Sequence, residues 1–387
     1  MNLKKFLKKN DLNKLYVSGW LRFFGISVIA VFIPIYLLNL GYSLREVSVF
    51  YIFVSFFHIV FTIIGGRVIK KYGLRFVLLT SIPFRVIFFF LLFSLEFYPI
   101  SLVFLAFVFG TSNGLYWVGR LTLLAKNTEE HKRGSQLAIN GIIKKVVTLP
   151  GPIIGGFLLS FTNISIAIIF VLIFLILSFI PVFYLKDEKE DVDLKIKNIF
   201  KGLNWREKLI IFNKGIDDIM NTIVWPVFAF FFILHKYFVL GLVKFVEKMF
   251  LIISDYFSGK LFDKKGSIVI KYGGFFSIIL WIGRALVQSS FGVYLVDSFR
   301  GLVAPFILNG FDAECMELAN TQDEALHFMI AREILMHSGR IFLLIILFMV
   351  NDLKTVFIFG ILYSLIYVFI KFDGNRATKD VELEYES

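Results

Sequence analysis

Cysteine is almost absent from this sequence, and histidine and charged residues are scarce. The 387 residues include one cysteine, Cys315, five histidines and only 18% charged residues. A single cysteine excludes an intrachain disulfide and any cysteine-rich metal cluster. The five histidines show no metal-ligand spacing. We therefore expect no metal site and no bound cofactor.

Signatures of enzymes and of nucleic-acid binding are missing as well. No segment matches the Gly-x-x-x-x-Gly-Lys-Ser/Thr phosphate-binding loop, and no polar stretch is long enough for an ATP-hydrolysing domain. No nucleophile or acid–base constellation is present, which argues against an integral membrane enzyme. The net charge of +12 comes mostly from short segments between apolar runs, so it does not indicate a nucleic-acid partner.

Apolar residues are present in large excess. They make up 58% of the chain, including 49 Phe, and the mean hydropathy is +0.78. A helix that crosses the ~30 Å hydrocarbon core of a bilayer needs about 20 apolar residues. Twelve such runs occur, at roughly 15–38, 44–66, 74–95, 100–124, 134–160, 163–185, 207–234, 238–259, 268–288, 291–312, 326–349 and 354–371. The sequence predicts an all-α, polytopic membrane protein.

The charges between the runs predict how the chain crosses the membrane. Lys and Arg are retained on the cytoplasmic side. Segments on one side carry 26 of these residues, whereas the other side carries only Arg45, Lys236 and Lys354. We therefore expect a multi-pass protein of the plasma membrane with both termini in the cytoplasm.

The twelve runs fall into two sets of six. The longest polar interruption, residues 186–208, separates the sets. We assign residues 1–185 to an N-terminal six-helix bundle, 186–206 to a cytoplasmic linker, 207–375 to a C-terminal six-helix bundle and 376–387 to a cytoplasmic tail. Residues 66–73 and 259–266, which are 193 positions apart, read as the same short loop after the second helix of each set. This repeat indicates an internal duplication.

The repeated loop resembles the signature of the major facilitator superfamily of secondary transporters. The family pattern is Gly, three residues, Asp, a basic residue, any residue and Gly. The two copies supply Gly66, Lys70, Lys71 and Gly73, and Gly259, Asp263, Lys264 and Gly266, with Lys70 in place of the acid. In the family, that acid helps to lock the two halves at the inner face. The resemblance implies that these residues form an inner gate.

The resemblance covers nearly the whole chain. It implies two six-helix bundles, alternating access, and a small-molecule substrate bound near the midplane. Members of the superfamily typically work as monomers.

A second local match lies in the fifth run. Its residues Gly151, Pro152, Gly155 and Gly156 resemble the Gly-Pro-x-x-Gly-Gly element of proton-coupled drug exporters in this superfamily. The element favours export. The alternative is a kinked, tightly packed helix with no bearing on direction, because proline bends a helix and small residues let a neighbour approach.

Charges held at membrane depth are the candidates for the substrate and ion pathway, because each is costly without a partner or a cavity. The first half contributes only basic residues, namely Arg22, Arg85, Arg120, Lys144 and Lys145. For Arg22 and Arg120, reaching the headgroups by snorkelling is an equal alternative.

The second half contributes acids, namely Asp217, Asp218 and Asp297, the last with Arg300. Helical spacing predicts local pairs between Lys214 and Asp218 and between Asp297 and Arg300. Asp217 then has the fewest partners, so it is the first candidate for a proton-carrying group.

This charge distribution has two interpretations. In one, the basic residues bind a carboxylate or phosphate while an acid across the cavity carries a proton. In the other, opposed charges bridge the halves and stabilise one conformation. With an ion gradient as the only evident energy source, we expect proton-coupled export of a small organic molecule, either anionic or amphipathic. Import by proton symport, and a transporter-fold sensor without flux, are the alternatives.

Overall fold

The computed structural model describes residues 11–127, 133–189, 199–266, 268–320 and 325–370. Within these ranges every regular element is a helix. The first half contains α2 (Asp11–Ile29), η1 (Ala30–Phe32), α3 (Ile33–Asn39), α4 (Leu44–Tyr72), α5 (Leu74–Ser94), α6 (Leu102–Asn127), α7 (Arg133–Thr148), α8 (Gly151–Phe161) and α9 (Ile164–Phe183). The second half contains α10 (Trp205–Ile219), η4 (Met220–Val224), α11 (Trp225–Ala229), η5 (Phe230–Leu234), α12 (Tyr237–Lys265), α13 (Ile268–Leu286), α14 (Ser290–Asn320), α15 (Ala325–Val350) and α16 (Phe357–Phe369).

These helices make twelve crossings when each interrupted helix is counted once. α2 continues through η1 into α3, α7 is followed by α8, and α10 continues through η4, α11 and η5. Ten of the crossings are long and apolar enough to span a membrane by composition, and α16 is a shorter apolar helix. The remaining crossing, α12, is 29 residues long but carries several charges. The predicted all-α fold with twelve transmembrane helices is confirmed.

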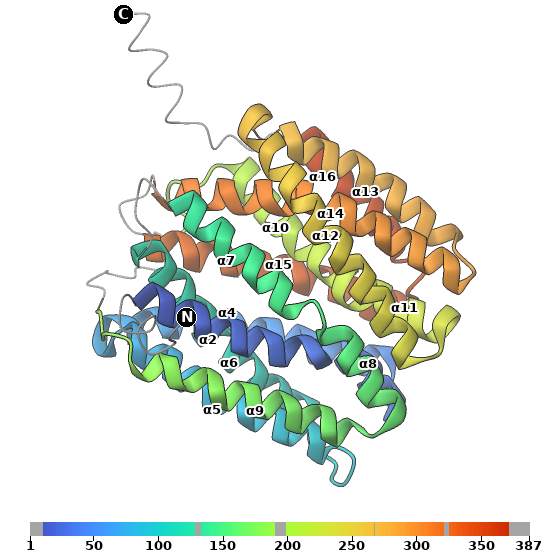
Figure 1. The fold of residues 1–387 in the computed structure, drawn as a ribbon, viewed down its shortest axis with the longest axis horizontal. Coiled ribbons are helices and arrows are strands. Elements are labelled where there is room, and N and C mark those ends of the chain that lie inside the picture. Colours follow the sequence, from blue (N-terminus) through green and yellow to red (C-terminus); the bar gives the residue numbers. More distant parts are fainter. Residues whose placement is uncertain (1–10, 128–132, 190–198, 267, 321–324, 371–387) are drawn as a thin grey trace, which may run out of the picture.

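The two halves of the chain lie side by side. In Figure 1, α2, α4, α5, α6, α8 and α9 (blue to green) lie below α12, α13, α14 and α16 (yellow to red), and α7 lies between the two sets. The halves meet where α8 packs against α12 and where α4 packs against α15. We call the side of the molecule that carries Asp11 the near side, and the side that carries the Gly41 turn the far side.

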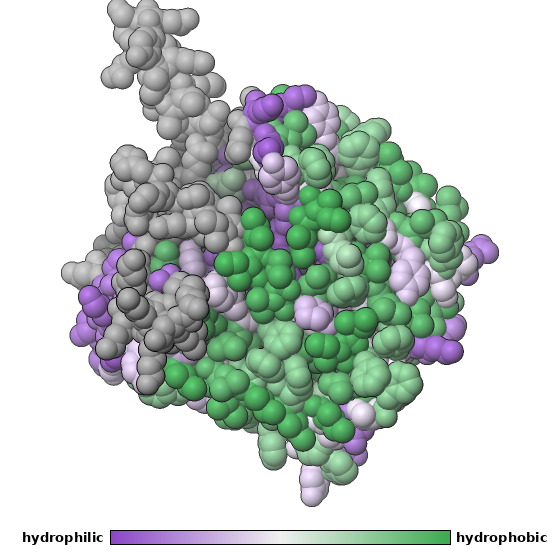
Figure 2. Space-filling view, viewed as in Figure 1, coloured by the Kyte–Doolittle hydropathy of each residue, from purple (hydrophilic) through white to green (hydrophobic). Residues whose placement is uncertain are grey.

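The outer surface is largely apolar, as a bilayer requires. Figure 2 shows hydrophobic residues over most of one face, with hydrophilic residues gathered mainly toward its edges. Large apolar side chains that point outward include Phe90, Ile176 and Phe257, which are 61%, 59% and 62% exposed. Burial against lipid replaces the burial that a soluble core would provide.

The repeated segment is mostly helical, so its prediction as a loop was wrong. α4 runs to Tyr72 and α12 to Lys265, and only Gly73 and Gly266 turn the chain, with φ of 89° and 56°. Glycine tolerates this left-handed region at no steric cost. At the start of the first copy, Gly65, beside Gly66, packs closely on α6, where an added Cβ would lie 2.8 Å from Val118.

The Gly-Pro-x-x-Gly-Gly segment brings backbones into direct contact. The helix breaks at Leu149 and Pro150, and α8 begins at Gly151. A Cβ on Gly156 would lie 2.6 Å from the carbonyl oxygen of Tyr237, and one on Gly241 would lie 2.4 Å from that of Pro152. Small residues therefore close the far side between α8 and α12. Toward the near side, Gly141 of α7 and Gly259 of α12 have open space around the Cβ position.

We expect Gly156→Ala to weaken the contact between the two halves. Its new methyl group meets fixed backbone, and overpacking of this kind typically costs about 1–3 kcal/mol. Gly141→Ala is the matched control, since it places the same methyl group in the same crossing where nothing lies within 4 Å. The melting temperature of the purified protein should fall for Gly156→Ala and stay level or rise for Gly141→Ala. Equal melting temperatures would show that the α8–α12 contact is not tight.

Candidate functional site

Asp297 on α14 is the centre of a buried ionic network in the second half. It is 0% exposed. Its carboxylate accepts hydrogen bonds from Lys244 Nζ at 2.8 Å, Arg284 Nη2 at 3.0 Å and Trp225 Nε1 at 2.7 Å. Four helical elements, namely α11, α12, α13 and α14, therefore meet at one side chain. Buried charges in membrane proteins are tolerated when they are paired in this way.

Glu247 extends this network along α12. It accepts a hydrogen bond from Lys244 at 2.8 Å, one turn away, and pairs with Arg300 of α14. The predicted local pair of Asp297 with Arg300 was wrong. Arg300 instead pairs with Glu247 and donates a hydrogen bond to Asn221 Oδ1 at 2.7 Å. Helical spacing shows which side chains share a face, but partners on other helices compete for them.

A second acidic group on α10 joins the same network. Lys214 Nζ donates to Asp217 at 2.8 Å and also pairs with Asp218, and Arg340 of α15 donates to Asp218 at 2.7 Å. Asn221 Nδ2 donates to Asp217 at 2.7 Å. The prediction that Asp217 is the acid least well matched by its neighbours in sequence was wrong, because the long Lys214 side chain reaches both i+3 and i+4.

The basic residues of the first half are compensated differently. The Arg22 guanidinium lies 3.8 Å from the centroid of the Tyr116 ring, Arg85 lies 4.5 Å from that of Phe109, and Lys144 lies 4.0 Å from that of Phe23. Such cation–π contacts replace part of the lost hydration. Neutral oxygens also contribute: Ser112 Oγ accepts from Arg22 at 3.4 Å, Asn113 pairs with Arg85, and the Leu15 carbonyl accepts from Arg120 at 3.4 Å.

These basic residues are deeply placed. Arg22 and Arg120 are 1% and 3% exposed, so neither snorkels to the membrane surface. Among the described residues, no carboxylate lies within 4.0 Å of Arg22, Arg85, Arg120 or Lys144. Within the same part of the chain, Arg22 Nη1 and Arg85 Nε have no hydrogen-bond partner. Arg22, Arg85, Arg120 and Lys144 are thus basic residues without a carboxylate at ion-pairing distance in the described part of the chain.

Two ion pairs join the halves near the middle of the helices. Lys145 of α7 donates to both oxygens of Asp255 on α12, at 2.7 and 2.6 Å. His58 Nε2 of α4 lies 2.9 Å from Glu333 Oε2 of α15. His337, one turn from Glu333, stacks on His58 with ring centroids 3.6 Å apart. Lys145 was predicted for the pathway. The sequence places His58 and His337 within helices but offers no sign of Glu333, which lies 275 positions from His58.

Arg284 is also absent from the residues that the sequence predicts for the pathway. It lies two residues before the end of α13, where an arginine is expected to contact lipid headgroups. In the structure, however, it is 0% exposed. Its guanidinium donates to Asn221 Oδ1 at 2.8 Å as well as to Asp297. Asn221 therefore connects the two acidic groups of the second half. The only local signal in the sequence is Trp281, one turn earlier in the helix. The fold adds Trp225, so that the guanidinium lies 4.6 Å from both the Trp225 and Trp281 ring centroids.

The histidine cluster brings together groups that can bind a metal ion. Ligand atoms of His58, Glu333 and His337 all lie within 4.8 Å of one another. However, Arg340 Nη1 lies 3.2 Å from His337 Nε2, and Arg332 Nη1 donates to Glu333 at 2.7 Å. A divalent ion would have to compete with both guanidiniums.

The predicted inner gate differs between its two copies. In the first, Asp187 and Glu188 from the start of the linker dock beside the Gly73 turn: Asp187 lies 3.4 Å from Arg75, and the Glu188 carbonyl accepts from the Leu74 amide at 2.8 Å. Linker acids thus stand near the position where Lys70 replaces the family acid. In the second copy, the side chain of Asp263 lies outside the described residues.

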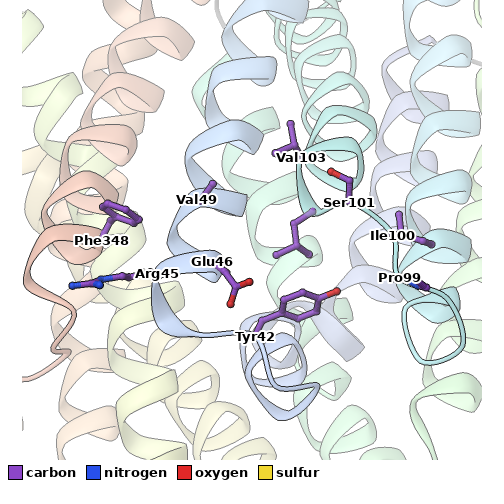
Figure 3. A pocket seen from close by; sticks show the side chains of 10 residues that line it. Tyr42, Arg45, Glu46, Val49, Pro99, Ile100, Ser101, Val103 and Phe348 are labelled. Atoms are coloured by element: carbon purple, nitrogen blue, oxygen red, sulfur yellow. The ribbon is translucent and has the colours of Figure 1, made fainter.

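A surface pocket lies away from these charges, on the far side. It has a volume of about 480 Å³ and lies between the start of α4, the start of α6 and the end of α15. Figure 3 shows Glu46 and Tyr42 beside it, with Arg45 turned toward Phe348. None of the residues predicted for the pathway lines it.

We expect Asp297→Asn to destabilise the protein strongly. The substitution leaves Lys244 and Arg284 buried without their shared anion, and breaking a buried pair typically costs about 3–5 kcal/mol. Asp312→Asn is the control on the same helix, because the Asp312 side chain is 67% exposed. In thermal unfolding in detergent, the melting temperature of Asp297→Asn should be clearly lower than that of Asp312→Asn. Equal melting temperatures would mean that Asp297 is not the centre of the network.

Comparison with known proteins agrees with this architecture. The family model described as Major Facilitator Superfamily matches residues 15–325. The chain is also 24% identical, over 399 residues, to "Uncharacterized protein YqgE" of Bacillus subtilis (strain 168), covering 95% of this chain and 92% of that relative. The family match spans most of the chain, from α2 to the start of α15. This protein therefore belongs to the Major Facilitator Superfamily and is a multi-pass secondary transporter, not an enzyme.

Proposed function

We propose that this protein is a proton-coupled exporter of a small organic anion that works by alternating access as a monomer in the plasma membrane, with both termini in the cytoplasm. The observation that carries the proton coupling is the His58–Glu333 pair. It is buried, it joins the two halves, and both of its members can gain or lose a proton.

Proton movement at Glu333 gives a physical link to conformation. When Glu333 is ionised, it attracts His58 of the other bundle and Arg332 of its own helix. Protonation removes that charge, so the cross-bundle attraction weakens at the moment a proton is bound. A buried pair that loses one charge becomes unfavourable, which drives the bundles toward a different arrangement. We assign this role to Glu333 in place of Asp217, because Glu333 pairs across the halves with His58, whereas the partners of Asp217, Lys214 and Asn221, lie in its own half.

The rest of the cycle follows from the other contacts between the halves. Opening on the far side requires α8 to leave α12 at Gly156 and Gly241, and the Lys145–Asp255 pair to change partners. With the near side in the cytoplasm, the described state is closed toward the outside. A carrier in this state accepts cargo from the cytoplasm. The helix-five element shared with exporters supports this direction.

The cargo site that we propose lies between the bundles and uses the basic residues Arg22, Arg85, Arg120 and Lys144 of the first half. The paired charges of the second half, around Asp217, Asp218, Asp297 and Arg300, form its opposite wall. An anion supplies the negative charge that the first half lacks, whereas the second half is already balanced by its own ion pairs.

The proposal is tested by proton flux in proteoliposomes. Wild-type protein should move protons when an organic anion is added on one side, and an imposed pH gradient should drive accumulation of that anion. Glu333→Gln should reduce accumulation to the level of protein-free liposomes while exchange of anion across the membrane remains measurable.

The matched control is Glu46→Gln. Glu46 is an exposed acid that caps α4 through Ser43, and glutamine preserves that cap. Accumulation by this variant should equal that of wild type. Undiminished proton-driven accumulation in Glu333→Gln would remove Glu333 from the coupling mechanism, and accumulation that depends on inward movement of the anion with protons would reverse the proposed direction.

A further inference from the structure

The first half presents aromatic rings together with its unpaired cations on one surface. Trp20 and Phe23 come from α2, Trp117 and Arg120 from α6, and Lys144 from α7. We call these five residues the basic aromatic surface. We propose that it binds a small planar aromatic carboxylate, with the ring stacked on Phe23 and Trp117 and the carboxylate held by Lys144 and Arg120. This inference rests on the proposed function, because it names the class of anion that the carrier takes.

The Phe23 and Trp117 rings are close enough to act as one platform, and Trp20 lies one turn from Phe23 on α2. The Phe23 and Trp117 centroids are 5.8 Å apart with their planes tilted by 38°, and Trp117 lies 5.6 Å from Tyr116. Trp20 is held in place by donating from Nε1 to Asn140 Oδ1 of α7 at 3.1 Å. Trp20, Phe23, Trp117 and Lys144 are all half-buried. Side chains that are fixed by neighbours and still partly accessible suit ligand binding without reorganisation.

The cations of this surface lack the anion that a ligand supplies. Lys144 Nζ lies 4.0 Å from the Phe23 ring centroid and 5.9 Å from that of Trp117, and the Arg120 guanidinium lies 5.3 Å from that of Phe23. A cation over a ring is only partly compensated for lost hydration. Behind them, Arg22 and Arg85 add two further buried positive charges. This concentration of charge attracts a carboxylate and repels a cation of the same shape.

Glycine makes the position of Arg120 possible. A Cβ on Gly19 of α2 would lie 2.5 Å from Arg120 Nη1 and 3.1 Å from its Cζ. The guanidinium therefore lies flat against the α2 backbone, next to Trp20. An alanine at this position would displace the guanidinium without removing any charge. Gly19 thus offers a second way to perturb the surface.

The second half does not provide an equivalent surface. Its tryptophans Trp225 and Trp281 both lie 0% exposed and are covered by Arg284, which is itself paired with Asp297. The two rings there are already in contact with a cation, and that cation is already paired with an acid. The aromatic anion is therefore assigned to the first half alone.

The test is equilibrium binding to the purified protein in detergent, where no gradient or transport is needed. The probes are 2-naphthoate, the saturated decalin-2-carboxylate and the cation 2-naphthylmethylammonium. We expect saturable binding of 2-naphthoate, binding of the saturated acid about tenfold weaker, and no saturable binding of the cation. Equal affinities for all three probes, or no binding of 2-naphthoate, would overturn the inference.

Variants locate the binding. Lys144→Gln should lower the affinity for 2-naphthoate about tenfold or more. Lys260→Gln is the matched control, because Lys260 Nζ also lies over a ring, 4.3 Å from the Tyr256 centroid, but outside the surface. Gly19→Ala should also lower the affinity for 2-naphthoate, although it leaves the net charge unchanged. Equal affinity in Lys144→Gln, Gly19→Ala and Lys260→Gln would show that the ligand binds elsewhere.

The two proposals fail in distinguishable ways. If 2-naphthoate does not bind but proton-driven transport of another anion is intact, only the proposal of an aromatic carboxylate ligand is refuted. Intact binding with transport that is indifferent to a pH gradient refutes only the proton coupling. If Lys144→Gln does not fold, as judged by gel filtration and melting temperature, Gly19→Ala alone decides the location.

Discussion

The need to compensate charge inside a low-dielectric bundle shapes both halves of this protein. A charge at membrane depth must find an opposite charge, a hydrogen-bonding group or a cavity. The second half meets this need with acids, since Asp297 alone accepts hydrogen bonds from Lys244, Arg284 and Trp225. The first half meets it with aromatic faces and neutral oxygens. The two bundles have a similar arrangement of helices but differ in buried charge. In the second bundle the buried charges pair with one another, whereas the first retains positive charge that a ligand can neutralise.

The contacts between the bundles are of two physical kinds. On the far side they are backbone contacts at glycines, which depend on shape alone. Near the middle they are ion pairs, His58–Glu333 and Lys145–Asp255, which depend on charge. Shape-based contacts do not respond to protons, whereas charge-based contacts do. A carrier built in this way can have its far side closed by packing while the energy of the closed state varies with the protonation of a few side chains.

Membership of a large transporter superfamily identifies the fold and the general mechanism but leaves the cargo open. Fold-level similarity does not specify function, which depends on the chemistry of particular sites. In this chain we propose that this chemistry is the combination of Trp20, Phe23 and Trp117 with Lys144 and Arg120 on one surface. The linker acids Asp187 and Glu188 show a comparable local departure, because they dock beside the Gly73 turn where the first copy of the signature has a lysine in place of its acid.

The sequence by itself determined the twelve crossings, the duplicated plan and the excess of basic residues in the first half, because hydropathy, glycine spacing and charge are local properties of the chain. It did not determine partners. Asp217 was expected to have the fewest partners among the acids, yet Lys214 reaches it. Asp297 was expected to pair with Arg300, yet it pairs with Lys244 and Arg284. Glu333 and His58 are 275 positions apart and meet only because α15 packs on α4. Only the tertiary structure decides such pairs, since a charged side chain on a helix has several neighbours within reach and the packing of the other helices selects among them.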